Sequence, residues 1–211
     1  MNRFRHPSNY PPSAPIYFYK VDGSYGCFSN FSPHPIELAG TTWATVEHYY
    51  QAHKFLGTKF EYLMAEIQSA STPELAAKIG RTPDYQPHPD WCLHKREVMY
   101  RAVWQKFNTH ADIRQILLAT SDTQIIEDSP VDYFWGCGTD GSGQNHLGRV
   151  LMQVRDELWL KSYELRKLWV MSYELLVLIA KPQLLDLSQN SDFSKKSEFL
   201  TSLGYYSLFP N

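Results

Sequence analysis

The sequence predicts an α+β protein: a compact, mainly helical domain with a small β-sheet, followed by a C-terminal extension. The strongest helical pattern lies late in the chain, where apolar residues recur at the spacing of one helix face. These residues are Leu147, Val150, Leu151, Val154 and Leu158. Strand patterns are short and few, and they do not alternate regularly with helices. Because parallel α/β folds require that alternation, a domain with more helix than strand is expected.

The N-terminal part supplies the strand patterns. Residues 1–15 are expected to form a flexible or clamped tail, because their prolines oppose regular structure. Residues 16–19 are aromatic and β-branched, which is typical of a strand. Residues 35–43 alternate around Gly40 and predict a small hairpin, and residues 124–127 predict one more short strand.

Helix-start and helix-stop residues mark the segments in between. Thr45 is a good N-cap for a helix over residues 46–55. Ser71, Pro73 and Glu74 predict the start of a second helix, which Gly80 is expected to end as the residue after its last turn. The remaining helices are expected at residues 91–107, 112–119 and from 147 onward.

Composition limits the class of protein. The 211 residues include 20 Lys+Arg and 22 Asp+Glu, so the net charge is −2 and a strongly electrostatic nucleic-acid binder is excluded. A hydrophobic share of 43% excludes disorder over the whole length. The aromatic share of 15% favours a ring-binding pocket in addition to a core.

Cysteine spacing and hydropathy bear on location. Cys27, Cys92 and Cys137 are widely spaced, which excludes zinc ribbons and thioredoxin-like sites and argues against a disulfide framework. The most apolar stretch, residues 168–180, is too short for a membrane span and contains Glu174. We therefore expect a cytoplasmic protein without a signal peptide, a metal or a cofactor.

One candidate catalytic pair lies in the helix predicted after Thr45. On that helix Glu47, Gln51 and Lys54 share a face, with Glu47 and Lys54 about 10 Å apart along the axis. A carboxylate and an amine at that separation suit chemistry at the anomeric carbon of a sugar. The alternative is a solvated helix face without a function. A metal site at His48 and His53 is disfavoured, because a spacing of five places them on different faces.

A glycine-rich segment and several aromatic residues are the other candidates. The loop from Gly143 to Gly148 runs into a helix, where free N–H groups and the helix dipole favour phosphate. Asn145 is expected either to cap that helix or to contact a ligand, and the alternative is an ordinary glycine-rich turn. Aromatic residues either stack on a base or pack in the core. These are Phe28, Phe31, Trp91 and Trp135.

The ordered set of motifs resembles the NADAR superfamily of YbiA-like N-glycosidases. The resemblance covers roughly residues 16–158, so we expect a tail at 1–15, the family domain at 16–160 and an extension of unknown role at 161–211. The matching segments are Phe28-Ser-Asn-Phe31, Trp43 to Phe55, Ala77 to Arg81, Lys106-Phe107, Leu117 to Thr120, Asp132 to Gly136 and Gly143 to Gly148.

The resemblance implies a compact α+β domain that cleaves an N-glycosidic bond. It makes Glu47 the catalytic carboxylate and Lys54 the catalytic amine. Whether Lys54 acts covalently, as a neutral amine that passes through a Schiff base, is left open. Asp132 and Trp135 would shape the ribose and base end, and Asn30, Asn145 and the Gly143–Gly148 loop would contact ribose or phosphate. The full set of implied substrate-binding residues is Phe28, Ser29, Asn30, Tyr50, Gln51, Arg81, Asp132, Trp135, Gly136, Gly143, Asn145 and Gly148.

Two substrate classes follow from the resemblance. One is ADP-ribose attached to guanine in nucleic acid, which we place first. The other comprises phosphorylated ribosyl-aminopyrimidine intermediates of riboflavin biosynthesis. The chain departs from the family pattern at Ala44, where proline is frequent, and in a longer segment at residues 82–89. Both departures concern substrate preference more than the reaction.

Two further alternatives stay open at the level of sequence. The domain is either an N-glycosidase or a module that binds ADP-ribose or a related nucleotide without cleaving it. The extension either packs on the domain or exchanges in a dimer, or it contacts a partner or a membrane surface near Trp159, Trp169 and Leu176. The oligomeric state is left undecided.

Overall fold

The computed structural model describes residues 14–189, and the side chains of residues 14–172. Residues 1–13 of the expected tail and residues 190–211 of the extension lie outside the described residues. The described part of the chain divides into two units, with the boundary between Trp159 and Leu160. Helices predominate and the strands are short, which confirms the predicted α+β class.

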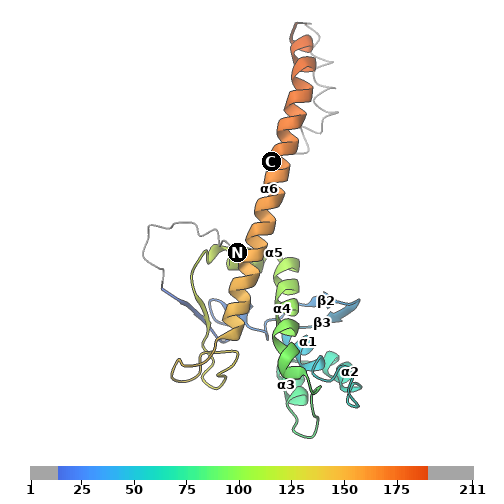
Figure 1. The fold of residues 1–211 in the computed structure, drawn as a ribbon, viewed down its shortest axis with the longest axis vertical. Helices are drawn as coiled ribbons and strands as arrows, with labels where there is room; N and C mark the ends of the chain where they lie inside the picture. The colour runs from blue at the N-terminus through green and yellow to red at the C-terminus, as the bar shows by residue number, and fades with distance from the viewer. Residues whose placement is uncertain (1–13, 190–211) are drawn as a thin grey trace. The chain divides into compact units, whose positions relative to one another are not determined.

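The first unit contains all the described strands and most of the helices. Its elements are β1 (Ile16–Phe18), η1 (Gly26–Phe28), β2 (Ile36–Leu38), β3 (Thr41–Trp43), α1 (Val46–Ala52), α2 (Leu63–Gln68), α3 (Pro73–Gly80), α4 (Trp91–Thr109), α5 (Ala111–Ala119), β4 (Ile125–Glu127) and the start of α6 (His146–Gln189) (Figure 1). Every residue of α1 is buried, and α1 contacts α2, α3 and α4. The first part of α6 places Leu147, Leu151 and Val154 in the same core.

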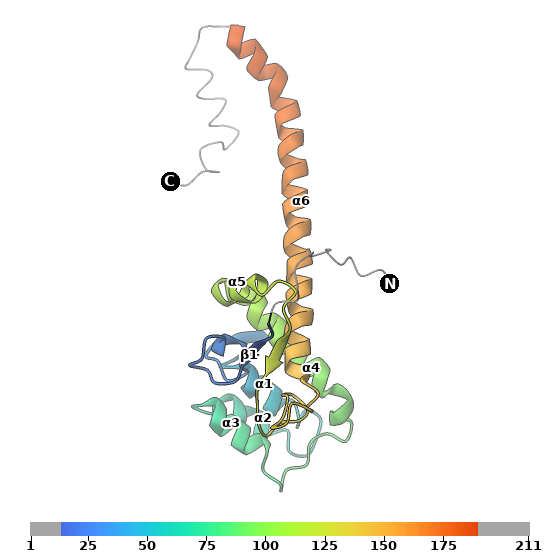
Figure 2. The ribbon, with the colours of Figure 1, turned by 90° about the vertical axis from the view of Figure 1, so that its left-hand side faces the viewer.

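The strands form two separate pairs. β1 and β4 run parallel, with Ile16 opposite Ile125, so that chain segments far apart in sequence lie side by side (Figure 2). β2 and β3 form the predicted hairpin, and its turn at Ala39 and Gly40 has φ values of 53° and 72°. Positive φ at both turn residues matches the twist of antiparallel strands.

Helix α1 begins as predicted and ends earlier. The Thr45 hydroxyl accepts a hydrogen bond from the His48 N–H at 3.4 Å, which confirms the cap. The prediction of helix to residue 55 is wrong, because α1 ends at Ala52. The N–H groups of Lys54 and Phe55 donate to carbonyls three residues back, which tightens the chain into turns. Lys54 therefore lies beyond the helix, not on its face.

Helix α3 corrects the predicted role of Gly80. Thr72, not Ser71, caps this helix through a hydrogen bond from Leu75 N–H, and Pro73 is its first residue. Gly80 is the last helical residue and has no left-handed conformation, so it does not end the helix by the predicted mechanism. A Cβ at this position would lie 2.2 Å from Gln51 Oε1, and the glycine therefore allows α3 to approach α1 closely.

The second unit contains the rest of α6. Several large apolar side chains in it are exposed, among them Leu160, Leu165, Leu168, Val170 and Met171. Within residues 14–189, no helix is long and apolar enough to cross a membrane.

Candidate active site

A cavity of about 760 Å³ opens in the first unit, a size that suits a small organic substrate. The loop after β1, the loop after η1, helices α1, α3 and α4, and the loop after β4 supply its walls. Most of the predicted site residues line it, namely Ser29, Asn30, Glu47, Tyr50, Gln51, Lys54, Arg81, Asp132 and Trp135.

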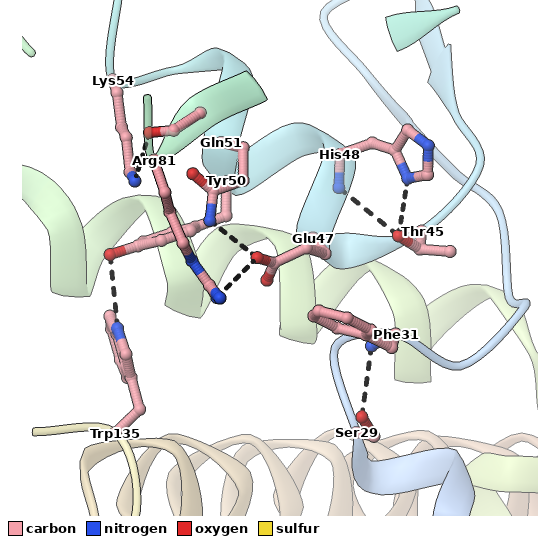
Figure 3. A network of polar contacts seen from close by, with 11 residues as sticks. Ser29, Phe31, Thr45, Glu47, His48, Tyr50, Gln51, Lys54, Arg81 and Trp135 are labelled. Atoms are coloured by element: carbon pink, nitrogen blue, oxygen red, sulfur yellow. Dashed lines mark hydrogen bonds and ion pairs between the residues drawn. The ribbon is translucent and has the colours of Figure 1, made fainter. Parts of the chain in front are cut away.

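Glu47 presents a buried carboxylate to this cavity. Its Oε1 atom accepts a hydrogen bond from Gln51 Nε2 at 2.7 Å and pairs with the Arg81 guanidinium at 3.3 Å (Figure 3). Burial raises the pKa of the Glu47 carboxyl, while the Gln51 hydrogen bond and the Arg81 charge oppose that rise. A carboxyl whose pKa is moved towards neutrality can both accept and return a proton.

Lys54 lies on the same cavity wall. Its Nζ donates to the Gly80 carbonyl at 2.9 Å, just before Arg81, and lies 5.8 Å from the centre of the Tyr50 ring (Figure 3). Burial lowers the pKa of the Lys54 amine to about 8, although the Glu47 charge opposes that shift. A sizeable fraction of the amine is therefore neutral near pH 8, as a nucleophilic lysine requires.

The turn at Gly80 and Arg81 connects Lys54 with Glu47. The Gly80 carbonyl accepts the Lys54 amine, and the Arg81 guanidinium donates to the Glu47 carboxylate. We predict that Gly80→Ala costs about 1–3 kcal/mol of unfolding free energy, because the added methyl group meets the Gln51 side chain. The variant should also lose activity, because Gln51 holds the Glu47 carboxylate. Thermal unfolding and turnover measure both effects.

Lys78→Ala, on the exposed side of the same helix, is the matched control for Gly80→Ala. It should leave both the unfolding midpoint and the turnover close to the wild-type values. A Gly80→Ala protein as stable and active as wild type would show that the close approach of α3 to Gln51 has no consequence.

Tyr50 and Trp135 form an aromatic wall of the cavity that Glu47 and Lys54 also line. The Trp135 indole N–H donates to the Tyr50 hydroxyl at 3.3 Å, and the two rings meet edge to face (Figure 3). The Asp132 carboxylate accepts the N–H groups of Phe134 and Trp135 at 2.8 and 2.7 Å. Asp132 therefore fixes the loop that carries Trp135, in addition to lining the cavity.

The loop with Ser29 and Asn30 is fixed by a buried lysine. Lys106 donates to the Ser29 carbonyl at 2.9 Å and to the Ser32 hydroxyl at 2.6 Å. Burial lowers the pKa of Lys106 to about 7. Asn30 connects this loop to α1, because its carbonyl accepts the Glu47 N–H at 3.1 Å. The buried Asn30 Oδ1 has no hydrogen-bond partner in the described structure, so a ligand donor would satisfy it.

Other predicted residues do not line the cavity. Phe28 is fully buried and packs edge to face against Phe18 and Phe107, and Trp91 packs against Tyr50 as part of the core. Gly136, Gly143, Asn145 and Gly148 also lie outside the lining.

The expectation of free N–H groups in the glycine-rich loop is wrong. The N–H groups of residues 143–147 all donate to backbone carbonyls of residues 133–137. Phosphate binding by these groups would break hydrogen bonds within the domain, which costs free energy. The loop instead packs closely, because a Cβ on Gly143 would lie 2.4 Å from the Gly136 carbonyl oxygen.

Sequence reasoning missed several residues of the cavity. Glu127 and Ser129 lie at and beyond the end of β4, Lys20 follows β1, and Glu74 lies on α3. The position of Glu127 at the end of a predicted strand was the one signal in the sequence for it. Its neighbours in space come from distant parts of the chain, so spacing gave no indication of a shared site.

A buried carboxyl, a desolvated amine and an aromatic wall line one cavity, and these are groups that chemistry at a sugar carbon uses. The NADAR domain family matches residues 17–159, and the chain belongs to this family.

Known relatives agree with this membership. The chain is 56% identical over 143 residues to N-glycosidase Npun_R5314 of Nostoc punctiforme, covering 68% of this chain and 92% of that protein. It is 42% identical to N-glycosidase YbiA of Escherichia coli, covering 68% of this chain and 88% of that protein. The NMR structure of E. coli YbiA matches with a TM-score of 0.66 and 39% identity, over 74% of this chain and 90% of that one.

A third relative is larger. The chloroplastic riboflavin biosynthesis protein PYRR of Zea mays is 46% identical over an alignment of 156 residues, covering 68% of this chain and 25% of that protein. From the close similarity to the two N-glycosidases, which it covers almost completely, the chain is an enzyme of the N-glycosidase class.

Proposed function

We propose that the chain hydrolyses the N-glycosidic bond between a phosphorylated ribose and a heterocyclic base, with Glu47 and Lys54 at the ribose C1′ carbon. The observation that supports this most is that both side chains line one cavity and are joined through the Gly80–Arg81 turn. The neutral Lys54 amine would attack C1′, and the Glu47 carboxylate would take a proton from the water that releases the sugar.

The charge of the cavity bears on the choice of substrate. Acidic residues outnumber basic ones on its walls, with Asp22, Glu47, Glu74, Glu127 and Asp132 against Lys20, Lys54 and Arg81. Three basic residues are too few for the many cation contacts that binding of a nucleic-acid backbone requires, whereas a single phosphate group needs few. This favours a ribosyl-aminopyrimidine phosphate, and so does the name of the Zea mays relative, a riboflavin biosynthesis protein. The guanine-linked ADP-ribose expected first is the second candidate.

A parallel assay tests both candidates. The full chain is incubated with a ribosyl-aminopyrimidine 5′-phosphate and with an oligonucleotide carrying ADP-ribosyl-guanine, and release of the base is followed by chromatography. We expect faster release from the first substrate. Release from the oligonucleotide alone would reverse the assignment. Calorimetric binding of ADP-ribose without release from either substrate would establish a binding module and overturn the proposal.

The domain up to residue 160 is expected to suffice for activity. The residues found to line the cavity in the described part of the chain lie between positions 19 and 135, and the buried residues described in α6 end at Leu158. Deleting residues 161–211 should therefore leave kcat within about twofold of the full chain, because the deletion removes none of the cavity-lining or core residues described in the first unit. Turnover and size-exclusion chromatography measure activity and oligomeric state. A large loss of kcat at unchanged stability would assign the extension a direct role.

A further inference from the structure

Glu127 places a further carboxyl in the cavity that carries Glu47. It is the last residue of β4, and it lines the cavity. Its Oε2 atom is buried and has no hydrogen-bond partner in the described part of the chain. A buried carboxyl oxygen without a donor is costly as a charged group, whereas a protonated carboxyl can donate to a ligand.

The backbone of Glu127 forms hydrogen bonds with two residues of the segment between Gly136 and Gly148. Its N–H donates to Asn145 Oδ1 at 2.9 Å, and its carbonyl accepts the Cys137 N–H at 2.8 Å. Asn145 adds a hydrogen bond from its Nδ2 to the Ile125 carbonyl at 2.8 Å. The strand end that carries the carboxyl is thereby fixed to the start of α6.

Two glycines make that attachment possible. A Cβ on Gly148 would lie 2.2 Å from the Ile125 carbonyl oxygen and 2.5 Å from Asn145 Oδ1, and a Cβ on Gly136 would lie 3.0 Å from the Glu127 carbonyl oxygen. These residues lie outside the cavity lining but pack around the strand that carries Glu127. The structure gives the segment a positioning role, which the resemblance alone did not indicate.

Glu47 and Glu127, two of the acidic residues that line the cavity, differ in their partners. Glu47 Oε1 accepts hydrogen bonds from Gln51 and Arg81, and such donors stabilise a carboxylate. Burial raises the pKa of Glu127 to about 8, and the charges of Asp132 and Glu47 add to that rise. Carboxyls whose surroundings differ in this way divide the roles of base and acid between them.

We propose that Glu127 is the general acid that protonates the departing base. The inference rests on the proposed function, because it needs Lys54 as the attacking amine. When Lys54 Nζ forms its bond to C1′, the bond from C1′ to the base nitrogen breaks and leaves its electron pair on that nitrogen. The Glu127 carboxyl gives its proton to the nitrogen, and its carboxylate takes up the proton that the Lys54 amine loses.

The rate should depend on pH through both groups. Lys54 must be neutral to attack, so the rate rises as pH increases through the Lys54 pKa of about 8. Glu127 must be protonated to act as an acid, so the rate falls as pH increases through the Glu127 pKa, which is also about 8. The charges of Asp132 and Glu47 act on Glu127, and the charge of Glu127 acts on Cys137. The other charged residues found in the lining are Lys20, Asp22, Lys54, Glu74 and Arg81. A bell-shaped profile with a narrow maximum is expected for the wild type.

Glu127→Gln, which keeps the size of the side chain but cannot transfer a proton, tests the inference. We expect kcat to fall about 100-fold with KM changed only a few-fold, and the falling alkaline limb to disappear while the rising limb stays. Glu37→Gln, on the exposed side of β2, is the matched control and should keep the wild-type profile. The full chain and the substrate that it cleaves faster are used throughout.

Two results would overturn the inference: a Glu127→Gln enzyme within about threefold of wild type, or a slow variant that keeps the alkaline limb. Thermal unfolding establishes whether Glu127→Gln is folded. If Glu127→Gln does not fold, Glu127→Asp replaces it, and this variant must keep the alkaline limb because aspartate retains a carboxyl. Failure of the proposed function is distinct, because the wild type would then release no base or Glu47→Gln would have wild-type turnover.

Discussion

Replacing Lys54 with arginine should lower kcat by about 10³-fold or more, although the positive charge is kept. The pKa of the Lys54 amine, lowered by burial to about 8, leaves a neutral fraction that can attack a carbon atom. A guanidinium is protonated at every accessible pH and has no lone pair to offer. The longer side chain would still reach the Gly80 carbonyl as a donor, so the loss would reflect nucleophilicity and not charge.

Chemical trapping makes the same point directly. Borohydride reduces a Schiff base to a stable amine, so treatment during turnover should add a ribose phosphate to the wild-type chain, which mass spectrometry detects. The adduct should be absent from Lys54→Ala. Lys59→Arg, at an exposed position five residues on, should keep both turnover and adduct. Wild-type turnover in Lys54→Arg would exclude the covalent route and leave Lys54 with a purely electrostatic role.

Local structure was predictable where local chemistry decides it. The Thr45 cap and the hairpin turn at Gly40 depend on a few neighbouring residues, and both are confirmed. The end of α1 was not predictable from helix periodicity, since the chain tightens after Ala52 while its polar pattern continues. Lys54 reaches the cavity from a turn instead of the helix face. The seven-residue spacing therefore identified Glu47 and Lys54, although the expected position of Lys54 on the helix face was wrong.

Long-range structure was out of reach of the same reasoning. The parallel pairing of β1 and β4 joins strands at Ile16 and Ile125, and no local pattern specifies that partner. The pairing, together with the Asn145 contacts, brings the end of β4 to the cavity. Helix α2 also escaped prediction, because only Leu63 and Ile67 are buried in it and they give too little periodicity.

The glycine-rich segment shows how one pattern supports two physical explanations. Closely spaced glycines occur both where a phosphate approaches the backbone and where two backbone segments approach each other. The second explanation holds for Gly143, which lies against Gly136 and Cys137, and for Gly148, which lies against Ile125 and Asn145. Only the hydrogen-bond partners of the N–H groups distinguish the two cases, and those partners are a property of the folded chain.

Replacing Glu47 with glutamine should lower kcat by about 10³-fold while leaving the protein at least as stable as wild type. The amide oxygen of the new side chain can accept the hydrogen bonds from Gln51 and Arg81 that the carboxylate accepts, so packing and orientation are kept. Proton transfer is lost, because an amide neither takes nor returns a proton near neutral pH. Glu66→Gln, exposed on α2, is the control and should match wild type in turnover and unfolding.

The stability of the Glu47→Gln variant should depend less on pH than that of the wild type, and the sign follows from the direction of the shift. Burial raises the pKa of Glu47 in the folded chain above its ordinary value, so the folded state holds this proton more tightly than the unfolded state. Wild-type stability from this group therefore falls as pH rises between the two pKa values. Glutamine does not ionise and has no such penalty. The melting temperature of the variant minus that of the wild type should therefore be larger at about pH 8 than at about pH 5. A variant less stable than wild type at the higher pH would show that the ionised Glu47 stabilises the fold, and that its burial is not a cost accepted for catalysis.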